Sequence, residues 1–276
     1  MDPNRMDVEE CREMGKVLDE HLHPTTFPLA LRFLAPQEEV PEGVKRVERK
    51  MTHCQAMSVS RRYGRSLYMA YDDFVPYCYA PFIYGFLQVK KEADFDAIAE
   101  SGVMYACASK EAALRTLETI PFMPYGKYEV VAFSPLKWTR IEPQFIVIYG
   151  NPAQMLRVVQ GLSKKREKGA CFESLIAYGW SVCAYGLARS IATGEPQFFL
   201  PDYGERRFAL ATDEEMGVVI PGSLLPDFVE GLEETYKLGA RYPIPFFLDF
   251  SPMADLYSPL FGLVEERKRM KEEKGG

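Results

Sequence analysis

The six cysteines carry the most reactive side chains in this 276-residue chain: Cys11, Cys54, Cys78, Cys107, Cys171 and Cys183. No two of them form a C-x-x-C pair and their spacing makes no compact disulfide framework, so most are expected to be free thiols in a reducing compartment. A thiolate can act as a nucleophile, a redox centre or a metal ligand, and a neighbouring arginine or a helix N-terminus favours it.

Cys54 and Cys183 occupy matching positions in two similar segments of the chain, the predicted helix before RRYGRSLYMA and VCAYGLARSIATGEPQFFL. If these halves pack pseudo-symmetrically, the two thiols could approach each other near the central axis. Arg61 and Arg62 of one half and Arg189 of the other are the candidate cations beside them. The alternative is that both cysteines fill core space, which is common for buried cysteine. The residues leave both interpretations open.

A second candidate site is the corner between a strand and a helix in FIVIYGNPAQ (145–154). Its first five residues are apolar, β-branched or aromatic, which predicts a strand buried on both faces. Gly150 allows a tight turn, Asn151 is a favourable N-cap and Pro152 suits the first helical turn. We interpret this as half of a βαβ unit, whose helix N-terminus holds an anion through Gly150, Asn151 and Gln154. An ordinary capped helix is the alternative.

Two adjacent arginines are further candidates for binding an anion. Arg206 and Arg207 follow a turn and begin the segment RRFALA, which is predicted to be a strand. One arginine would then point inward, because side chains alternate along a strand. An inward arginine needs an anionic partner, either a carboxylate of the protein or a ligand. Arg61 is a third candidate ligand-binding cation.

Several familiar chemistries have no motif in this chain. His21, His23 and His53 are its only histidines, and no cysteine stands at zinc-site spacing from them, so no metal ligands are assigned. There is no G-x-S-x-G for a serine nucleophile, no Walker A sequence and no G-x-G-x-x-G. Catalytic triads, and ATP or NAD binding through those motifs, are therefore not expected.

The composition restricts the partners and the compartment. A formal net charge of -6 argues against a nucleic-acid partner, which usually requires a basic surplus. No apolar run reaches the roughly 20 residues that span a bilayer, and the acidic N-terminus does not resemble a signal peptide. We expect a cytoplasmic protein with no membrane partner.

Hydrophobic periodicity predicts alternating helices and strands. Predicted helices cover 5–22, 51–64, 90–100, 110–120, 152–163, 171–190 and 224–238, and predicted strands cover 27–34, 65–71, 103–109, 127–136, 145–149, 196–201, 206–211 and 214–220. The order strand, cysteine helix, strand, strand, helix occurs twice. We therefore expect an α/β (or α+β) protein whose mixed sheet is built from two similar, intimately packed halves, through an internal duplication.

The expected organisation has four parts. An N-terminal helix occupies 1–24, the first half 25–140 and the second half 141–240. A Pro- and aromatic-rich arm with a charged tail forms 241–276, packed over the body and ending in a short solvated helix.

Five blocks of the sequence resemble the ArCR family, a prokaryotic family with a domain of unknown function (number 169). They are HCQAMSVSRRYG, IPFMPYGKYEVVAFSPL, EPQFIVIYGNPAQMLRVVQGL, VCAYGLARSIATGEP and GERRFALATDEEMGVVIP, in this order across roughly residues 25–235. The resemblance implies an uncharacterised protein of the kind found in anaerobic bacteria and archaea, with no settled activity.

The resemblance can be carried over position by position. Cys54 matches the cysteine of a Y-C-Q-A block, with His53 in place of the aromatic residue, and Cys183 matches the cysteine near a second helix. The G-N-P-A-Q block matches 150–154, and Gly204, Arg206 and Arg207 lie in a block that the family usually writes with G-S-R. The family's Cys-Pro-Gly-like loop appears as PYCYAP (76–81), and the cysteine expected before G-S-R is absent around Asp202. These departures weaken the expectation of a four-cysteine cluster.

The expected function is binding of a small anionic molecule or cofactor between the two halves, as an accessory protein of anaerobic metabolism. One alternative is an enzyme or redox protein that uses Cys54 or Cys183, and another is a cysteine-ligated metal or iron–sulfur protein. The residues identify neither the ligand nor a reaction. They also leave the oligomeric state open.

Overall fold

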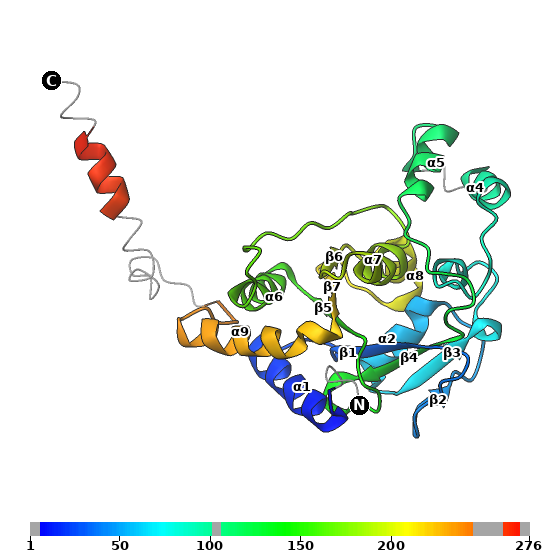
Figure 1. The fold of residues 1–276 in the computed structure, drawn as a ribbon, viewed down its shortest axis with the longest axis horizontal. Coiled ribbons are helices and arrows are strands. Elements are labelled where there is room, and N and C mark those ends of the chain that lie inside the picture. The colour runs from blue at the N-terminus through cyan, green and yellow to red at the C-terminus, as the bar shows by residue number, and fades with distance from the viewer. Residues whose placement is uncertain (1–5, 101–105, 245–261, 271–276) are drawn as a thin grey trace.

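A mixed sheet of seven strands forms the centre of the protein in a computed structural model that describes residues 6–100, 106–244 and 262–270 (Figure 1). Its order is β2-β3-β4-β1-β5-β7-β6. The strands are β1 (Leu29–Leu34), β2 (Lys45–Arg46), β3 (Leu67–Ala70), β4 (Val130–Pro135), β5 (Phe145–Gly150), β6 (Gln197–Phe199) and β7 (Met216–Pro221). The mixed α/β class expected from the sequence is confirmed.

Helices connect these strands. They are α1 (Val8–Leu22), α2 (His53–Tyr63), α3 (Ala80–Ile83), α4 (Lys91–Glu100), α5 (Lys110–Glu118), α6 (Pro152–Lys164), α7 (Arg189–Thr193), α8 (Tyr203–Ala209) and α9 (Leu225–Lys237). A π-helical segment, η4 (Ser181–Ala188), runs directly into α7, and 3-10 turns form η1 (Tyr71–Asp73), η3 (Leu136–Trp138) and η5 (Gly222–Leu224). None of the helices in the described residues is long and apolar enough to cross a membrane.

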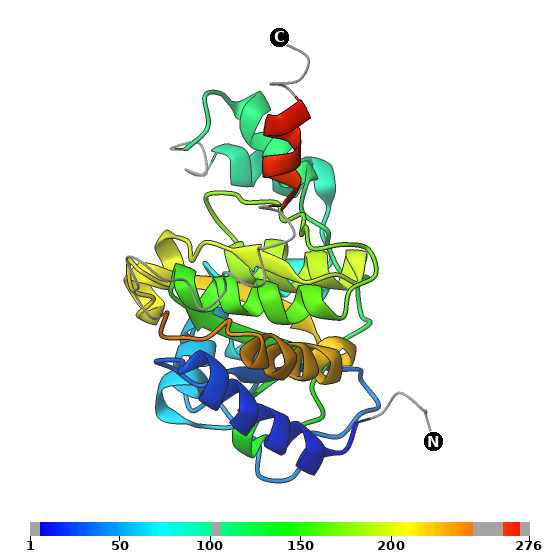
Figure 2. The same cartoon turned by 90° about the vertical axis from the view of Figure 1, so that its left-hand side faces the viewer.

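Strand β5 shows how one sheet serves two cores. Phe145, Val147 and Tyr149 belong to the core on one face, while Ile146 and Ile148 belong to the core on the other. All six residues of β5 are buried, as its apolar sequence predicts. Helices α1, α6 and α9 cover the second face and lie side by side in Figure 2. Helix α2, the short helix α3 and the η4–α7 segment pack on the first face.

The middle of the sheet is the antiparallel pair β1 and β5. Outward from it, β4 lies beside β1 and β7 lies beside β5, both antiparallel. Leu29 at the start of β1 is opposite Pro135 at the end of β4, and Phe145 at the start of β5 is opposite Pro221 at the end of β7. The β1–β4 and β5–β7 pairs therefore share one register, while β2, which pairs parallel with β3, has no counterpart beside β6.

Several predicted elements differ from the structure. Both neighbours of β5 are antiparallel to it, but β6, the next strand along the chain after α6, runs parallel to β5 with β7 between them. The buried strand and the capped helix of 145–154 are thus present, and the βαβ unit they begin is split by β7. Residues 171–180 are irregular rather than helical, and helix begins only at η4. In the predicted strand 103–109, residues 106–109 form turns, and the rest lies outside the described residues. The predicted arm falls largely on 245–261, which also lies outside them, while 262–270 are helical and exposed.

Candidate functional site

Four segments that are far apart in the sequence meet around a cavity of about 330 Å3, which we call the cysteine pocket. Two of them belong to the range predicted as the first half and two to the range predicted as the second. They are 52–54 at the start of α2, 77–80 leading into α3, 178–183 leading into η4, and 202–208, which contains most of α8. The pocket is therefore built by tertiary packing and not by one local motif.

Capping of α2 fixes the position of Cys54. The Thr52 hydroxyl accepts a hydrogen bond from the backbone N–H of Gln55 at 3.1 Å, and the Gln55 side chain accepts one from the Thr52 N–H at 2.9 Å. This reciprocal pair is a capping box, and it holds the first helical turn in place. Cys54 is the second residue of that turn, so its thiol is presented at the positive end of the helix.

Cys183 lies in the first turn of η4. Trp180, the residue before η4, has a positive φ of 55°, which turns the chain sharply into the helix. The Cys183 thiol lies 3.6 Å from the Trp180 carbonyl oxygen. The Ser181 N–H donates to Asp202 Oδ2 at 3.2 Å, so the carboxylate at the start of α8 ties down the start of η4. Cys183 is buried, whereas Cys54 and Cys78 are half-buried.

Cys78 joins the pocket from the turn before α3. Its sulfur accepts backbone hydrogen bonds from His53 and Ala80, and these bonds lower the pKa of the thiol. Burial acts against them more strongly, and the net pKa of Cys78 is raised. The bond from His53 links the Cys78 turn directly to the start of α2, beside Cys54.

The pKa values of all three thiols of the cysteine pocket are raised. Burial is the first cause that raises the pKa of Cys54, followed by Glu205 and Asp202, and then by the other two thiols. Burial likewise raises the pKa of Cys183, followed by Cys78 and the same two carboxyl groups. The charged groups that shift the pKa of Cys54 and Cys183 are therefore carboxyl groups, whereas the sequence led us to expect arginines. The thiols are neutral at pH 7.

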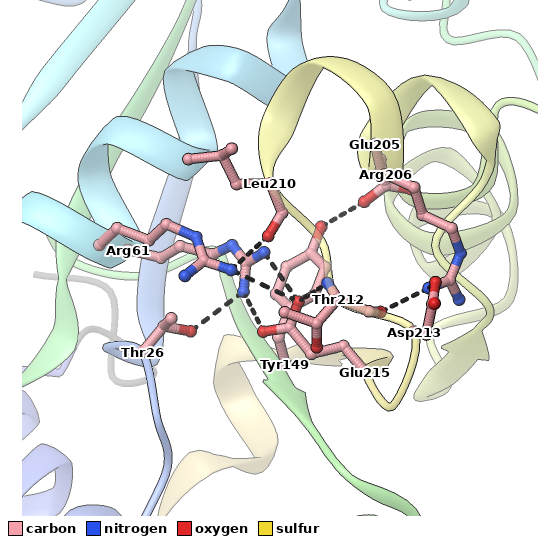
Figure 3. Close-up of polar contacts among 10 residues, drawn as sticks. Thr26, Arg61, Tyr149, Glu205, Arg206, Leu210, Thr212, Asp213 and Glu215 are labelled. Atoms are coloured by element: carbon pink, nitrogen blue, oxygen red, sulfur yellow. Dashed lines mark hydrogen bonds and ion pairs between the residues drawn. The ribbon is translucent and has the colours of Figure 1, made fainter.

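A series of buried polar contacts links α2, β5 and α8 (Figure 3). The Arg61 guanidinium donates to both carboxylate oxygens of Glu215, at 2.6 and 3.1 Å, and to the Thr26 hydroxyl at 3.1 Å. It also lies 4.0 Å from the ring centre of Tyr149, at the end of β5. The Tyr149 hydroxyl in turn donates to Glu205 Oε1 at 2.6 Å. Arg61, predicted as a ligand-binding cation, is thus committed to the protein's own carboxylate.

Glu205, at the end of this series of polar contacts, contributes to the raised pKa of Cys54 and of Cys183. Its side chain is buried, with 1% of the residue exposed. Burial is the main cause that raises its pKa to about 8, and the neighbouring Asp202 adds to it, although the bond from Tyr149 opposes the shift. Near neutral pH this carboxyl group therefore carries a proton.

Aromatic side chains form the wall of the cysteine pocket. Trp180 lies 5.9 Å from Tyr79 and 6.0 Å from Tyr178, measured between ring centres. The six rings that line the pocket are Tyr77, Tyr79, Tyr178, Trp180, Tyr203 and Phe208. Among the described residues, Asp202 is the one acidic residue in the lining, and neither lysine nor arginine contributes to it. Faces of aromatic rings and a carboxylate attract cations and planar molecules.

The structure gives no geometry for a metal centre at this place. Among residues 6–100, 106–244 and 262–270, no three His, Cys, Asp or Glu side chains are arranged to hold a metal ion. His53 is buried beside the thiols, and its Nε2 lies 2.9 Å from the Tyr84 hydroxyl. Burial lowers the pKa of His53 to about 3, so its ring is neutral.

The corner at the start of α6 brings Gly150, Asn151 and Gln154 together, and protein groups already surround it. Asn151 Oδ1 accepts from the Gln154 N–H at 2.9 Å, and Gln154 Oε1 accepts from the Asn151 N–H at 2.8 Å. The Gln154 amide donates to two backbone carbonyls at the end of α1, and the Asn151 amide donates to the Tyr242 hydroxyl. A Cβ at Gly150 would lie 2.8 Å from Gln154 Oε1. An anion at this corner stays a prediction.

Arg206 and Arg207 lie on helix α8, so the prediction of a strand at 206–211 is wrong. Arg206 donates to the carbonyl oxygens of Pro201, at 3.0 Å, and of Thr212. Arg207 is exposed, and its guanidinium lies 5.8 Å from the ring centre of Tyr203. No described contact joins either arginine to the α6 corner.

Sequence reasoning identified Cys54 and Cys183 and missed Asp202, Glu205 and Tyr149 as their neighbours. One local signal was available: Asp202-Tyr203-Gly204-Glu205 has the spacing of a capping box. Both bonds of that box form, with Asp202 Oδ1 accepting from the Glu205 N–H at 2.9 Å. Recognising it would have predicted a helix at α8 and a carboxylate at its start.

Comparison with known proteins gives two matches. Residues 17–231 match the model of a family described as "Uncharacterised ArCR". This range contains every residue that lines the cysteine pocket. An "Uncharacterized protein MJ0308" of Methanocaldococcus jannaschii is 29% identical over 233 residues, which cover 83% of this chain and 96% of that protein. No solved structure matches the chain.

Proposed function

We propose that this chain, which belongs to the uncharacterised ArCR family, binds a small planar organic molecule in the cysteine pocket. The observation that carries the proposal is the lining: six aromatic rings, three thiols and Asp202 around about 330 Å3. A cavity of this size and apolar character with a few polar groups is typical of small-molecule sites. The expected ligand is positively charged or neutral, because the lining offers a carboxylate and aromatic faces but no lysine or arginine.

The anionic ligand expected from the sequence does not suit this pocket. An anion would meet the Asp202 carboxylate in the lining, and Asp202 is one of the groups that raise the pKa of Cys54 by disfavouring negative charge there. A cationic ring would instead lie between aromatic faces and near a carboxylate. The pocket is thus better matched to a cation than to carboxylate or phosphate ligands.

The position of the pocket supports a binding site between the two proposed halves, for which we propose a common origin. Cys54 stands in the first turn of α2 and Cys183 in the first turn of η4. These segments pack on the same face of the sheet, on either side of the central β1–β5 pair with its matched strand register. We propose 25–140 and 141–240 as the two halves. Superposition of one half on the other tests the duplication: Cys54 and Cys183 must coincide to within one helical turn.

A cysteine-dependent enzyme or redox protein is the second candidate. Glu205 favours it, because a carboxyl group whose pKa is raised to about 8 could exchange protons with a neighbouring thiol near neutral pH. Burial opposes it by keeping Cys54 and Cys183 protonated. The balance favours binding over nucleophilic catalysis by the free protein.

Calorimetry with three related rings tests the proposed ligand class. The probes are 1-methylnicotinamide, which is cationic, nicotinamide, which is neutral, and nicotinate, which is anionic. We expect the cation to bind most tightly and nicotinate most weakly. Asp202→Asn removes the charge and also one of the two backbone N–H bonds that Asp202 accepts, and the lost bond affects both probes alike. The cation should therefore lose about 1 kcal/mol more binding energy than nicotinamide. Asp213→Asn is the control, since the Asp213 side chain is 98% exposed and lies outside the pocket lining.

The contribution of the aromatic side chains to binding can be tested with a matched pair of tyrosines. Tyr77 lines the pocket and Tyr125 does not, yet each is 64% exposed. Tyr77→Ala should weaken binding of 1-methylnicotinamide, whereas Tyr125→Ala should not. Equal binding of the three probes, or equal effects of the two tyrosine changes, would overturn the proposal.

A further inference from the structure

Five cationic side chains line a second cavity, of about 780 Å3, which we call the cationic groove. They come from separate elements: Arg12 from α1, Lys45 and Arg46 from β2, Arg65 from the residues after α2, and Arg140 from the residues after η3. Glu48 is the one acidic residue among its lining residues. In a chain with a net charge of -6, such a concentration of positive charge is unusual.

The cations of the groove are only partly neutralised. Arg12 pairs with Glu9 at 2.7 Å, and Arg46 pairs with Asp73 at 2.9 Å. Arg65 reaches Glu48 only at 3.9 Å, and both of these side chains are mostly exposed. Such a pair contributes little to stability.

Lys45 and Arg140 leave a positive charge uncompensated in the groove. In the described part of the chain, neither of them forms an ion pair with a carboxylate. Both are exposed. An arginine fork matches the geometry of phosphate and carboxylate oxygens, and a lysine supplies a point charge.

An aromatic ring is held in the same cavity. Trp138 is 40% exposed, lines the groove and packs edge-on against Phe27, with ring centres 4.6 Å apart. Its Nε1 donates to the Gly64 carbonyl oxygen at 3.3 Å. These contacts fix the indole beside the cations instead of leaving it to rotate freely.

Two glycines leave room for these side chains. Gly64 ends α2 with φ +70°, and a Cβ there would lie 2.9 Å from Trp138 Cζ2. Gly43 has φ +79°, and a Cβ there would lie 2.6 Å from Arg140 Nη1. The backbone at Gly64 and Gly43 therefore lies directly against the indole and the guanidinium. A side chain at either position would collide with them.

We infer that the cationic groove binds a nucleoside phosphate, with the base against Trp138 and the phosphates at Lys45 and Arg140. Phosphate groups require several cationic donors, and a base requires a flat apolar surface. The groove supplies both within a volume suited to a small ligand. This inference is independent of the proposed function of the cysteine pocket, from which it differs in lining residues and in the sign of its charge.

The two tryptophans make a direct test practical, because Trp138 lines the groove and Trp180 lines the cysteine pocket. In the Trp180→Phe protein, fluorescence reports on Trp138 alone. ATP should quench it in a saturable way, tripolyphosphate should bind about tenfold more weakly for lack of a base, and adenosine should not bind measurably. Added salt should weaken ATP binding, since the contacts are exposed ion pairs.

Arg140→Gln in the same background should weaken ATP binding about tenfold, because it removes one charged contact. Arg115→Gln is the matched control: this exposed arginine on α5 carries the same charge outside the groove. Circular dichroism would establish that each variant is folded. Absence of ATP binding, an equal loss in both variants, or an oligoglutamate peptide that binds as tightly as ATP would overturn the assignment.

Discussion

The two ends of helix α2 offer opposite chemistry. At its first turn, Cys54 opens into a pocket of thiols, aromatic rings and a carboxylate, with no lysine or arginine in the lining. At its other end, the C-cap residue Gly64 lines a groove with five cationic side chains. The 11-residue helix separates them by about 16 Å of axis. One element thus positions two surfaces of opposite chemical character, for which we propose ligands of opposite charge.

The comparison shows that burial, and not residue type alone, decides what a charged group can do. Arg61 and Arg65 are four positions apart, yet Arg61 is buried against Glu215 while Arg65 is exposed in the groove. A buried guanidinium must be paired, so it stabilises the fold and is unavailable to a ligand. An exposed one adds little to stability and remains available.

Arg61→Ala gives the largest expected effect and tests this distinction. The change leaves the Glu215 carboxylate, with a side chain 6% exposed, without its main partner. We expect a loss of about 3–5 kcal/mol in the free energy of unfolding, measured by urea denaturation. Arg65→Ala is the control and should change that free energy by less than about 0.5 kcal/mol. Similar losses in both proteins would contradict the division into structural and available cations.

Whether these features could be predicted from the sequence depends on whether their causes are local or tertiary. The strand at 145–149 and the helix after Pro152 could be predicted because an apolar run and a cap are local signals. Helix α8 was mistaken for a strand because RRFALA was interpreted by alternation while the capping box before it was overlooked.

The site itself was predictable only in part. The matching of Cys54 with Cys183 indicated a shared region, and both thiols do line one pocket. Asp202 and the turn at Cys78 enter it through packing between segments more than a hundred residues apart, which no local pattern encodes. The cationic groove is equally non-local. Lys45 and Arg46 belong to the basic run KRVERK (45–50), but the other three cations come from separate places in the chain.

Glu205→Gln should change how stability depends on pH. The carboxyl group has a pKa of about 8 in the folded protein and an ordinary value of 4.5. Between these values the unfolded chain releases a proton that the folded chain retains, so the free energy of unfolding falls as pH rises from 4.5 to 8. Glutamine cannot ionise, so the variant should lose on the order of 3 kcal/mol less over this range.

Chemical denaturation at a series of pH values measures this difference. Glu118→Gln is the control, since Glu118 is exposed on α5. It should leave the pH dependence unchanged. A Glu205→Gln protein that loses as much stability as the parent between pH 5 and pH 8 would show that Glu205 is ionised near the thiols. The pocket would then lie beside two negative charges, at Asp202 and Glu205.

Thiol alkylation tests whether the cysteine pocket is a binding site or contains a reactive cysteine. Cys171 is exposed, whereas burial raises the pKa of Cys54 and Cys183. Iodoacetamide at pH 7 should therefore modify Cys54 and Cys183 at least about tenfold more slowly than Cys171. Mass spectrometry of peptides gives the rate for each cysteine. Faster modification of Cys54 than of Cys171 would instead favour the cysteine-dependent enzyme.

The smallest expected effect comes from the groove, at Gly64. Gly64→Ala places a side chain at φ +70° and within 2.9 Å of the Trp138 ring. Gly126→Ala places one at φ +71° with no atom within 4 Å, so it reports the backbone strain alone. That strain should cost about 1 kcal/mol in each protein. The additional loss in Gly64→Ala, roughly 0.5–1 kcal/mol, then measures how firmly the indole is held. Since Trp138 must shift to admit the methyl group, its fluorescence in the Trp180→Phe background should change with Gly64→Ala and stay constant with Gly126→Ala. Equal stability and unchanged fluorescence would mean that the indole moves freely, and the groove would lose the fixed aromatic surface that distinguishes a nucleotide site from a purely cationic patch.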